Sequence, residues 1–196
     1  MKIIAATSNP GKIKEIKKIF SLPSLEIVSM KESGINIDVE ENGSTFLQNA
    51  LIKARAVAQL SDCAVLSDDS GLCVDALGGA PGIYSARYAG ENATDEDRMI
   101  KLLSALSGEK NRRAKFVSVV AFITPDKREF TATGEVLGRI TEKITGDGGF
   151  GYDPIFYSDE LGKTFGKASA DEKNSISHRA RALNNLFETL TKNKIF

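Results

Sequence analysis

The chain has 196 residues, 41% of them hydrophobic, which is enough to build a substantial core in one domain with two small lobes and no separate linker. Lysine plus arginine and aspartate plus glutamate number 26 each, so the overall positive charge typical of nucleic-acid-binding proteins is missing and we expect no nucleic-acid partner. Two cysteines without a Cys-x-x-Cys spacing, and no apolar run near ~20 residues, indicate a reduced, cytoplasmic protein with no membrane partner.

The first third of the chain predicts a strand, a tight loop and two helices. Residues 2–7 form a short apolar run that is typical of a buried strand. Asn9 and Pro10 suit the N-cap and first position of a helix whose apolar side includes Ile16. A second helix is expected to begin near Ser44 or Thr45, because Thr45 and Gln48 have the spacing of a capping box.

The middle of the chain predicts two more strands and a third helix. Residues 63–67 and 71–77 are strand-like, with the second run returning from a turn, and the Gly-rich residues 78–90 indicate an ordered loop. Thr94, followed by three acids, is expected to open a helix that Gly108 closes.

The last part predicts a hairpin, a glycine-rich loop and a final helix. Residues 114–140 form two long strands around a Pro-Asp turn, and 145–157 are a Gly-rich loop that leads into a short strand. Residues 169–190 are expected to be helical, with Ser169 and Glu172 at capping-box spacing. These alternating elements favour an α/β fold with a mixed sheet, in two lobes with a cleft between them.

The stretch "TSNPGK", residues 7–12, joins the first strand to the first helix. Free backbone N–H groups and the helix dipole favour an anion at such a helix start, and Lys12 adds a positive charge. The alternative is an ordinary capped turn with a surface lysine, which is a common structure. The spacing of a Walker A loop is absent.

Two pairs of adjacent acids, Glu40–Glu41 and Asp68–Asp69, are candidate metal ligands. Mg²⁺ prefers carboxylate and phosphate oxygens and needs only one or two protein carboxylates. In a regular strand Asp68 and Asp69 would point to opposite faces, so only one would line a given cleft. The alternative is a turn in which acid and serine side chains accept backbone hydrogen bonds. Ligands of open α/β sheets lie at the carboxyl ends of strands, which favours function.

Asn49 and Lys53 lie four residues apart on one side of the second predicted helix, at the border of its apolar stripe. A lysine in this place usually extends to solvent, but it also suits a cleft.

The loop "GGFGYDP", residues 148–154, combines aromatic residues, glycines and an acid. Phe150 and Tyr152 could stack on a planar base or could simply fill the core.

The stretch "EKNSISHR" places Lys173, His178 and Arg179 near the start of the last helix. Arginine can read a purine carbonyl edge and lysine can bind a phosphate. The alternative is a solvated helix surface with a hydrogen-bonded histidine. His178 is the single histidine of the chain, which excludes a metal site made of several histidines.

Taken together and in this order, these motifs resemble the inosine triphosphate pyrophosphatase family, also called XTP/dITP diphosphatases. The resemblance spans nearly the whole chain and depends most on "DDSGLCVDALGGAPGIYSARYAG" and "GGFGYDPIF". It implies an elongated two-lobed α/β fold around a mixed sheet, with the nucleotide in a central cleft, and a homodimer. It also implies Mg²⁺-dependent hydrolysis of ITP, dITP and XTP to the monophosphate and pyrophosphate, which removes deaminated purines from the nucleotide pool.

The resemblance also implies roles for individual residues. Asp69 would be the catalytic acid residue, as general base or metal ligand, and Glu40 the second metal carboxylate, with Glu41 and Asp68 as alternatives. Ser70 would touch the substrate, and Phe150 would stack on the base. The remaining substrate-binding residues implied are Thr7, Ser8, Asn9, Pro10, Gly11, Lys12, Asn49, Lys53, Gly151, Tyr152, Asp153, Lys173, His178 and Arg179, the last two near the 6-keto edge.

One departure from the family pattern is visible in "TFGKAS", residues 164–169, where relatives often carry Ala-Glu instead of Gly166-Lys167. The change spares every residue named above, so it puts in doubt only the local loop contacts and the release of substrate.

Three other functions stay open at this point. A related pyrophosphatase could act on modified pyrimidine nucleotides, and a non-catalytic nucleotide-binding module could have kept the same residues. An RNA-binding protein could use the aromatic loop, but the zero net charge counts against it.

Overall fold

The computed structural model describes residues 1–20 and 22–196. The chain divides into two compact units. Unit 1 comprises Met1–Asp69, Ser118–Gly134 and Arg179–Phe196, and unit 2 comprises Ser70–Val117 and Glu135–His178. Strands β3, β4 and β5 each contribute residues to both units.

The strands of the described residues form a seven-stranded sheet in the order β2-β1-β3-β4-β5-β6-β7. Strand β1 runs parallel to both β2 and β3, whereas β6 runs antiparallel to β5 and to β7. The predicted α/β class with a mixed sheet is therefore confirmed. The strands are β1 (Lys2–Ala5), β2 (Glu26–Ser29), β3 (Ala64–Val74), β4 (Arg113–Ile123), β5 (Glu129–Ile140), β6 (Phe156–Ser158) and β7 (Lys163–Thr164).

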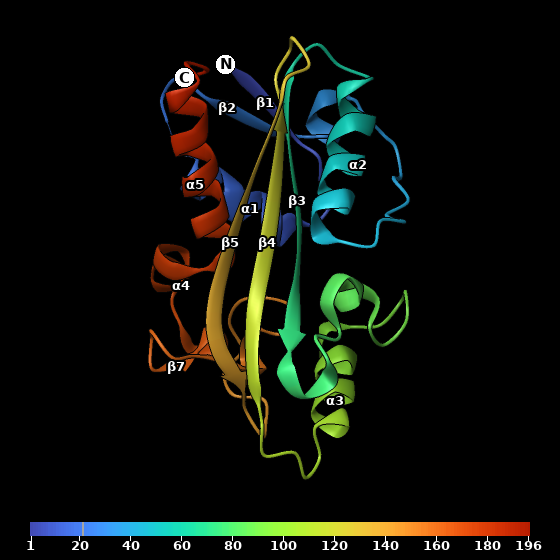
Figure 1. Cartoon of the computed structure of the whole chain (residues 1–196), viewed down its shortest axis with the longest axis vertical. Helices are drawn as coiled ribbons and strands as arrows, with labels where there is room; N and C mark the ends of the chain where they lie inside the picture. The colour runs from blue at the N-terminus through green and yellow to red at the C-terminus, as the bar shows by residue number, and fades with distance from the viewer. Residues whose placement is uncertain (21) are drawn as a thin grey trace. The chain divides into compact units, whose positions relative to one another are not determined.

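Unit 1 has helices on both faces of its strands. Figure 1 shows α5 (His178–Lys192) and α2 (Phe46–Ala58) on opposite sides, and α1 (Pro10–Ile19) on the side of α5. Apolar residues of α1 and α5 form one core cluster with β1, β3 and β4, in which Leu66 of β3 takes part. The next residue, Ser67, points to the other face and donates to the carbonyl of Ala50 in α2 at 2.6 Å.

Unit 2 packs α3 (Asp95–Ala105) against its own part of the sheet. Met99 and Leu102 of α3 share a core cluster with Leu72 and Val74 of β3 and with a group of aromatic side chains. Phe116 and Phe156 lie with ring centroids 4.6 Å apart within that group. Helix α4 (Ala170–Ile176) also belongs to unit 2. The 3₁₀ helices of the two units are η1 (Lys31–Ser33), η2 (Asp75–Leu77), η3 (Gly82–Arg87), η4 (Asp153–Ile155) and η5 (Phe165–Lys167).

The predicted helix starts are confirmed. The side chain of Asn9 accepts from the first backbone N–H groups of α1, and Thr94 and Ser169 each form a full capping box with the acid three residues later. Thr45 caps α2, but the return bond differs from the expectation. The side-chain oxygen of Gln48 accepts from the backbone N–H of Ser44 at 2.7 Å instead of that of Thr45.

Two predicted elements are wrong in their extent. The two strands expected at 63–67 and 71–77 are one continuous strand, β3, which runs through the acid pair and ends at Val74. Gly71 does not make a turn, because it lies within the extended backbone of β3. The single helix expected over 169–190 is two helices, because Ser177 has an extended backbone with ψ 155° between α4 and α5.

None of the helices in residues 1–20 and 22–196 is long and apolar enough to cross a lipid bilayer.

Candidate active site

In strand β3, the side chains of Asp68 and Asp69 point to opposite faces of the sheet. Asp68 follows the alternation of Leu66 and points toward α1 and α5, whereas Asp69 follows Ser67 and points toward α2. The two adjacent acids therefore belong to two different clusters of unit 1.

Asp68 is completely buried and is surrounded by positive charge. Its Oδ2 lies 2.8 Å from Nζ of Lys12 and 3.1 Å from Nη2 of Arg179, and its Oδ1 accepts a hydrogen bond from the hydroxyl of Ser118. Burial alone would raise the pKa of Asp68, but the charges of Arg179 and Lys12 hold that pKa well below its ordinary value. Asp68 is therefore a carboxylate that stays ionised.

Arg179 connects Asp68 to the first helix. Its second guanidinium nitrogen, Nη1, donates to the carboxylate of Glu15 on α1. Glu15 and Ser118 are absent from the residues predicted from the sequence. Glu15 looks like one more charge of a lysine-rich helix, and Ser118 looks like an ordinary strand residue, so the sequence carried no signal for either.

Asp69 lies in a cluster with a lysine and a second acid. Its Oδ1 is 3.4 Å from Nζ of Lys53, and the same ammonium is 3.1 Å from Oε1 of Glu41 and donates to the carbonyl of Asp68 at 2.9 Å. The other oxygen, Oδ2, is buried and has no hydrogen-bond partner among the described residues. Burial raises the pKa of Asp69 to about 6, and the charges of Glu41 and Asp68 act in the same direction against Lys53 and Lys12.

The loop that carries Glu40 and Glu41 is tied to α2 by Asn49. Oδ1 of this fully buried asparagine accepts from the backbone N–H of Gly43 at 2.8 Å. Its amide nitrogen is also buried and finds no acceptor within residues 1–20 and 22–196. Glu40 is exposed, and Glu41 is the acid of this pair that the structure brings to Lys53.

The loop from Thr7 to Lys12 has an exposed centre, and the first N–H groups of α1 are already capped by a side chain of the loop. Oδ1 of Asn9 accepts from the backbone N–H groups of Gly11 and Lys12 at 2.9 and 3.2 Å. Ser8 and Pro10 are exposed, and the hydroxyl of Thr7 accepts from the N–H of Asn9. The ammonium of Lys12 points to Asp68, and burial lowers its pKa although Asp68 opposes that effect.

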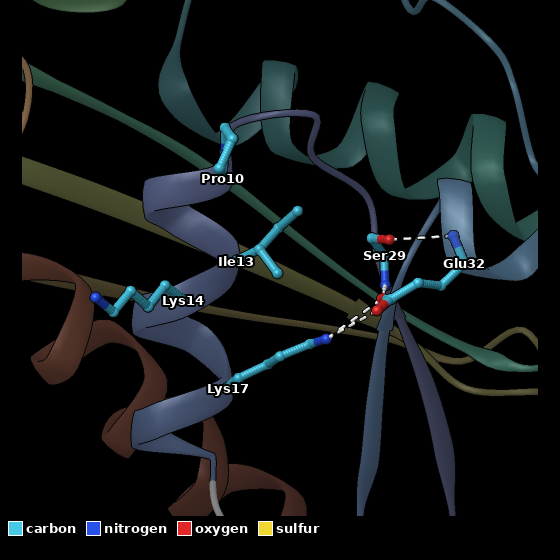
Figure 2. A pocket seen from close by; sticks show the side chains of 6 residues that line it. All are labelled: Pro10, Ile13, Lys14, Lys17, Ser29 and Glu32. Carbon is cyan, nitrogen blue, oxygen red and sulfur yellow. Dashed lines mark hydrogen bonds and ion pairs between the residues drawn. The ribbon is translucent and has the colours of Figure 1, made fainter.

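A hollow of about 410 Å³ lies beside α1, on the side of β2 and η1. Figure 2 shows Lys17 reaching across it to Glu32 while Lys14 extends away from it. Glu32 also accepts from the N–H of Ser29 at 2.6 Å. Pro10 is the one predicted site residue among its lining, so the hollow is separate from the two acid clusters.

The aromatic loop and the following lysine form a compact group within unit 2. The carboxylate of Asp153 accepts from the backbone N–H of Phe150 at 2.8 Å and from Nζ of Lys173 at 2.6 Å. The same ammonium lies 4.5 Å from the centroid of the Phe150 ring. Tyr152 is buried, and its hydroxyl donates to the carbonyl of Ser85 at 2.9 Å. The structure thus brings the predicted residues of this loop together with Lys173.

Two further predicted residues of unit 2 lie elsewhere in it. The ring of His178 stacks on Phe116 at 4.7 Å between centroids with the planes 13° apart. Ser70 is half-buried in β3. The roles that the resemblance implies for these residues, and for Lys12, Lys53 and Arg179 in unit 1, stay predictions.

Metal-binding groups are sparse in the described part of the chain, where no set of three or more His, Cys, Asp or Glu side chains is arranged to hold an ion. Mg²⁺ needs only one or two protein carboxylates, because it keeps several waters and takes further ligands from substrate phosphates. The buried and unpartnered Oδ2 of Asp69 is a suitable ligand atom for such an ion.

Known proteins match this chain over nearly its whole length. The model of the Ham1 family matches residues 3–189. Two proteins named dITP/XTP pyrophosphatase are close relatives. The one from Thermoanaerobacter sp. is 50% identical over 185 residues, 93% of each chain, and the one from Caldanaerobacter subterraneus subsp. tengcongensis is 48% identical over 195 residues, 98% of this chain and 97% of that protein.

A solved structure has the same fold. The Staphylococcus aureus Ham1 protein matches with a TM-score of 0.88 and 45% identity, covering 98% of this chain and 100% of that one. The family resemblance predicted from the sequence motifs is therefore confirmed, and this chain belongs to the Ham1 family.

Proposed function

We propose that this chain hydrolyses deaminated purine nucleoside triphosphates (ITP, dITP and XTP) to the nucleoside monophosphate and pyrophosphate. The names of its close relatives support this reaction. The structural observation that carries the proposal is Asp69, a buried acid with one unpartnered oxygen and a pKa of about 6, next to the ammonium of Lys53. Such a group is typical of a catalytic acid or base.

In this reaction a water molecule attacks the α-phosphorus, and the bond from that phosphorus to the bridging oxygen of pyrophosphate breaks. Asp69 takes the proton of the attacking water. A pKa near 6 leaves the carboxylate ionised at neutral pH and makes it a stronger base than an ordinary aspartate. Pyrophosphate departs with the electron pair of the broken bond.

Lys12 and Lys53 supply positive charge for the phosphates. Both ammonium groups now lie against carboxylates of unit 1, Lys12 against Asp68 and Lys53 against Glu41 and Asp69. Cations that are already held in place by neighbouring acids need little rearrangement to stabilise charge that develops on a phosphate.

Mg²⁺ is the cofactor we propose, with Asp69 as one protein ligand. Either Glu41, which shares Lys53 with Asp69, or the exposed Glu40 would supply the second carboxylate. The bound ion would neutralise phosphate charge and polarise the phosphoryl oxygens.

The group in unit 2 suits recognition of the base. Phe150, whose ring already lies beside the Lys173 ammonium, is the proposed stacking surface, and the buried imidazole of His178 is the proposed contact to the 6-keto group. The guanidinium of Arg179 lies in ion pairs with Asp68 and Glu15. We therefore assign to Arg179 the orientation of Asp68 in addition to the predicted contact with the base edge.

We further propose that the chain works as a homodimer and removes deaminated purines from the nucleotide pool of the cytoplasm. A dimer and its location are expectations from the family resemblance.

A turnover assay tests the reaction. The purified chain is given ITP, XTP, ATP, GTP and dUTP with Mg²⁺, and pyrophosphate is measured separately from single phosphate. We expect rapid pyrophosphate release from ITP and XTP and slow release from the others, with loss of activity when a chelator removes Mg²⁺. Release of single phosphate would contradict the proposed bond cleavage, and preference for dUTP would contradict the proposed substrate class.

A further inference from the structure

The aromatic loop of unit 2 has a second anchor, outside the residues that the motifs single out. Oδ2 of Asp95 accepts a hydrogen bond from the backbone N–H of Gly151 at 2.6 Å. This bond joins the first residue of α3 to the peptide that directly follows Phe150, across 56 positions of sequence.

The Asp95 carboxylate does not cap α3, so helix capping does not explain its position. The start of α3 is already capped, because the hydroxyl of Thr94 accepts from the N–H of Asp97 at 3.1 Å and the carboxylate of Asp97 accepts from the N–H of Thr94 at 2.8 Å. The other oxygen of Asp95 pairs with Arg98, and Nη1 of Arg98 donates to the carbonyl of Ala86 in η3. Its ion pair with Arg98 therefore holds the Asp95 carboxylate in its orientation toward the loop.

The loop needs such an anchor because its backbone is intrinsically free. Gly149 and Gly151 flank Phe150 and have φ angles of +76° and +62°, a region that glycine enters easily and leaves as easily. Asp153 fixes the N–H of Phe150 from one side, and Asp95 fixes the N–H of Gly151 from the other. The two peptide N–H groups on either side of the Phe150 Cα are thus held by two carboxylates.

We propose that Asp95 is a positioning residue for base recognition: its hydrogen bond to Gly151 holds the Phe150 ring in the orientation in which it stacks on the purine. This inference deepens the proposed function and rests on it. Asp95 need not touch the substrate. Its effect is to remove the cost of ordering the loop when the nucleotide binds, so it acts on affinity rather than on the chemical step.

The test compares Asp95→Ala and Asp95→Asn with Glu96→Ala, a matched control that removes a neighbouring exposed acid from the same first turn of α3. The first measurement is hydrogen–deuterium exchange of the peptide that contains residues 148–153, on the full chain without nucleotide. We expect the loop amides to exchange about tenfold faster in Asp95→Ala than in the wild type, since the lost bond has a charged acceptor. Glu96→Ala should match the wild type. Asp95→Asn keeps an oxygen acceptor, so its loop amides should exchange at nearly the wild-type rate.

The second measurement is steady-state kinetics with ITP. Asp95→Ala should raise KM about tenfold and leave kcat within about twofold, whereas Asp95→Asn should recover most of the affinity. Unchanged exchange in Asp95→Ala, or equal acceleration in Glu96→Ala, would overturn the anchor. Faster exchange with an unchanged KM would overturn its role in binding. Failure of the proposed function is distinguishable, because it would appear as absence of ITP turnover by the wild type while the exchange data still decide the anchor.

Discussion

The guanidinium of Arg179 lies 3.1 Å from the carboxylate of Asp68, and neither side chain is more than 1% exposed. Charges this deeply buried are tolerated only when each finds partners, and here the pair is completed by Lys12, Ser118 and Glu15. The cluster is balanced as a set, so the loss of one member leaves the others uncompensated.

Arg179→Ala should therefore destabilise the protein strongly. Removing one partner of a buried ion pair leaves an unpaired charge, and we expect a loss of about 3–5 kcal/mol in the free energy of unfolding. Urea denaturation followed by circular dichroism measures this. The matched control is Arg128→Ala, which breaks the exposed pair with Asp126 and should cost about 1 kcal/mol or less. Equal losses in the two variants would contradict the idea of a balanced buried cluster.

Asp69→Asn should abolish most of the turnover while the protein stays folded. The substitution keeps the size of the side chain and removes the base, so we expect kcat for ITP to fall by about 10²–10⁴-fold. Steady-state kinetics with thermal unfolding as a check on folding gives the answer. Asp62→Asn, which changes an exposed acid just before β3, serves as the control and should leave kcat unchanged. Near-normal turnover in Asp69→Asn would remove Asp69 from the mechanism.

The rate should also fall in acid as Asp69 takes up a proton. Because burial raises the pKa of Asp69 to about 6, kcat/KM for ITP should decline tenfold per pH unit below about pH 6 and level off above it. The measurement is a pH–rate profile at a low and constant Mg²⁺ concentration, because an ion bound to Asp69 would itself lower the pKa that the profile reports. An acid limb centred near pH 4 would mean that an ordinary carboxylate, and not Asp69 in its buried state, controls the rate.

The same pKa predicts a dependence of stability on pH. The pKa of Asp69 is higher in the folded chain, at about 6, than its ordinary value of 3.8, so the folded state binds more protons between these values. Its contribution to stability is thus full below about pH 4 and is lost as the pH rises through about 6. The difference in the free energy of unfolding between Asp69→Asn and the wild type should therefore shift by roughly 2–3 kcal/mol in favour of the variant when the pH is raised from 4 to 7. Denaturation curves of both proteins at the two pH values test this, and parallel behaviour would contradict it.

Gly43→Ala should disturb the loop that carries Glu40 and Glu41. A Cβ at this position would lie 2.6 Å from Oδ1 of Asn49 and 2.7 Å from Cβ of Gln48, which is too close for either. We expect the hydrogen bond from Gly43 to Asn49 to break, with a fall in apparent Mg²⁺ affinity of about tenfold, comparable to one lost hydrogen bond. Mg²⁺ titration of ITP turnover measures the effect. The neighbouring Ser44→Ala adds no atom and removes only the exposed hydrogen bond from the Ser44 hydroxyl to Gln48, so it should stay within about twofold of wild type. An equal effect in both variants would point to a general change of the loop.

Local features of the fold were predictable from the sequence because their causes lie within a few residues. The cap at Asn9 and the capping boxes at Thr94 and Ser169 depend on one side chain and the N–H groups that follow it. The break at Ser177 was not predictable in this way, since neither glycine nor proline marks it. The continuity of β3 through Gly71 likewise depends on neighbouring strands that residue order does not reveal.

The candidate site was predictable as a set of residues but not as an arrangement. The alternation of a strand is enough to place Asp68 and Asp69 on opposite faces. Their partners are distant in sequence, 56 residues away for Lys12 and 111 for Arg179, and no local pattern connects them. Only the fold shows that the ionised Asp68 is compensated by two positive side chains and that Oδ2 of Asp69 has no hydrogen-bond partner among the described residues.

The order in which the chain is synthesised gives the division into units a temporal meaning. All residues of unit 2 have been synthesised once the chain reaches His178, whereas unit 1 also needs the segment Arg179–Phe196, which is synthesised afterwards. A growing chain, extended at about 5–20 residues per second, therefore contains Asp68 for several seconds before its guanidinium partner, Arg179, has been synthesised. A chain that stops before Arg179 lacks the guanidinium that pairs with Asp68, so it cannot assemble the acid cluster.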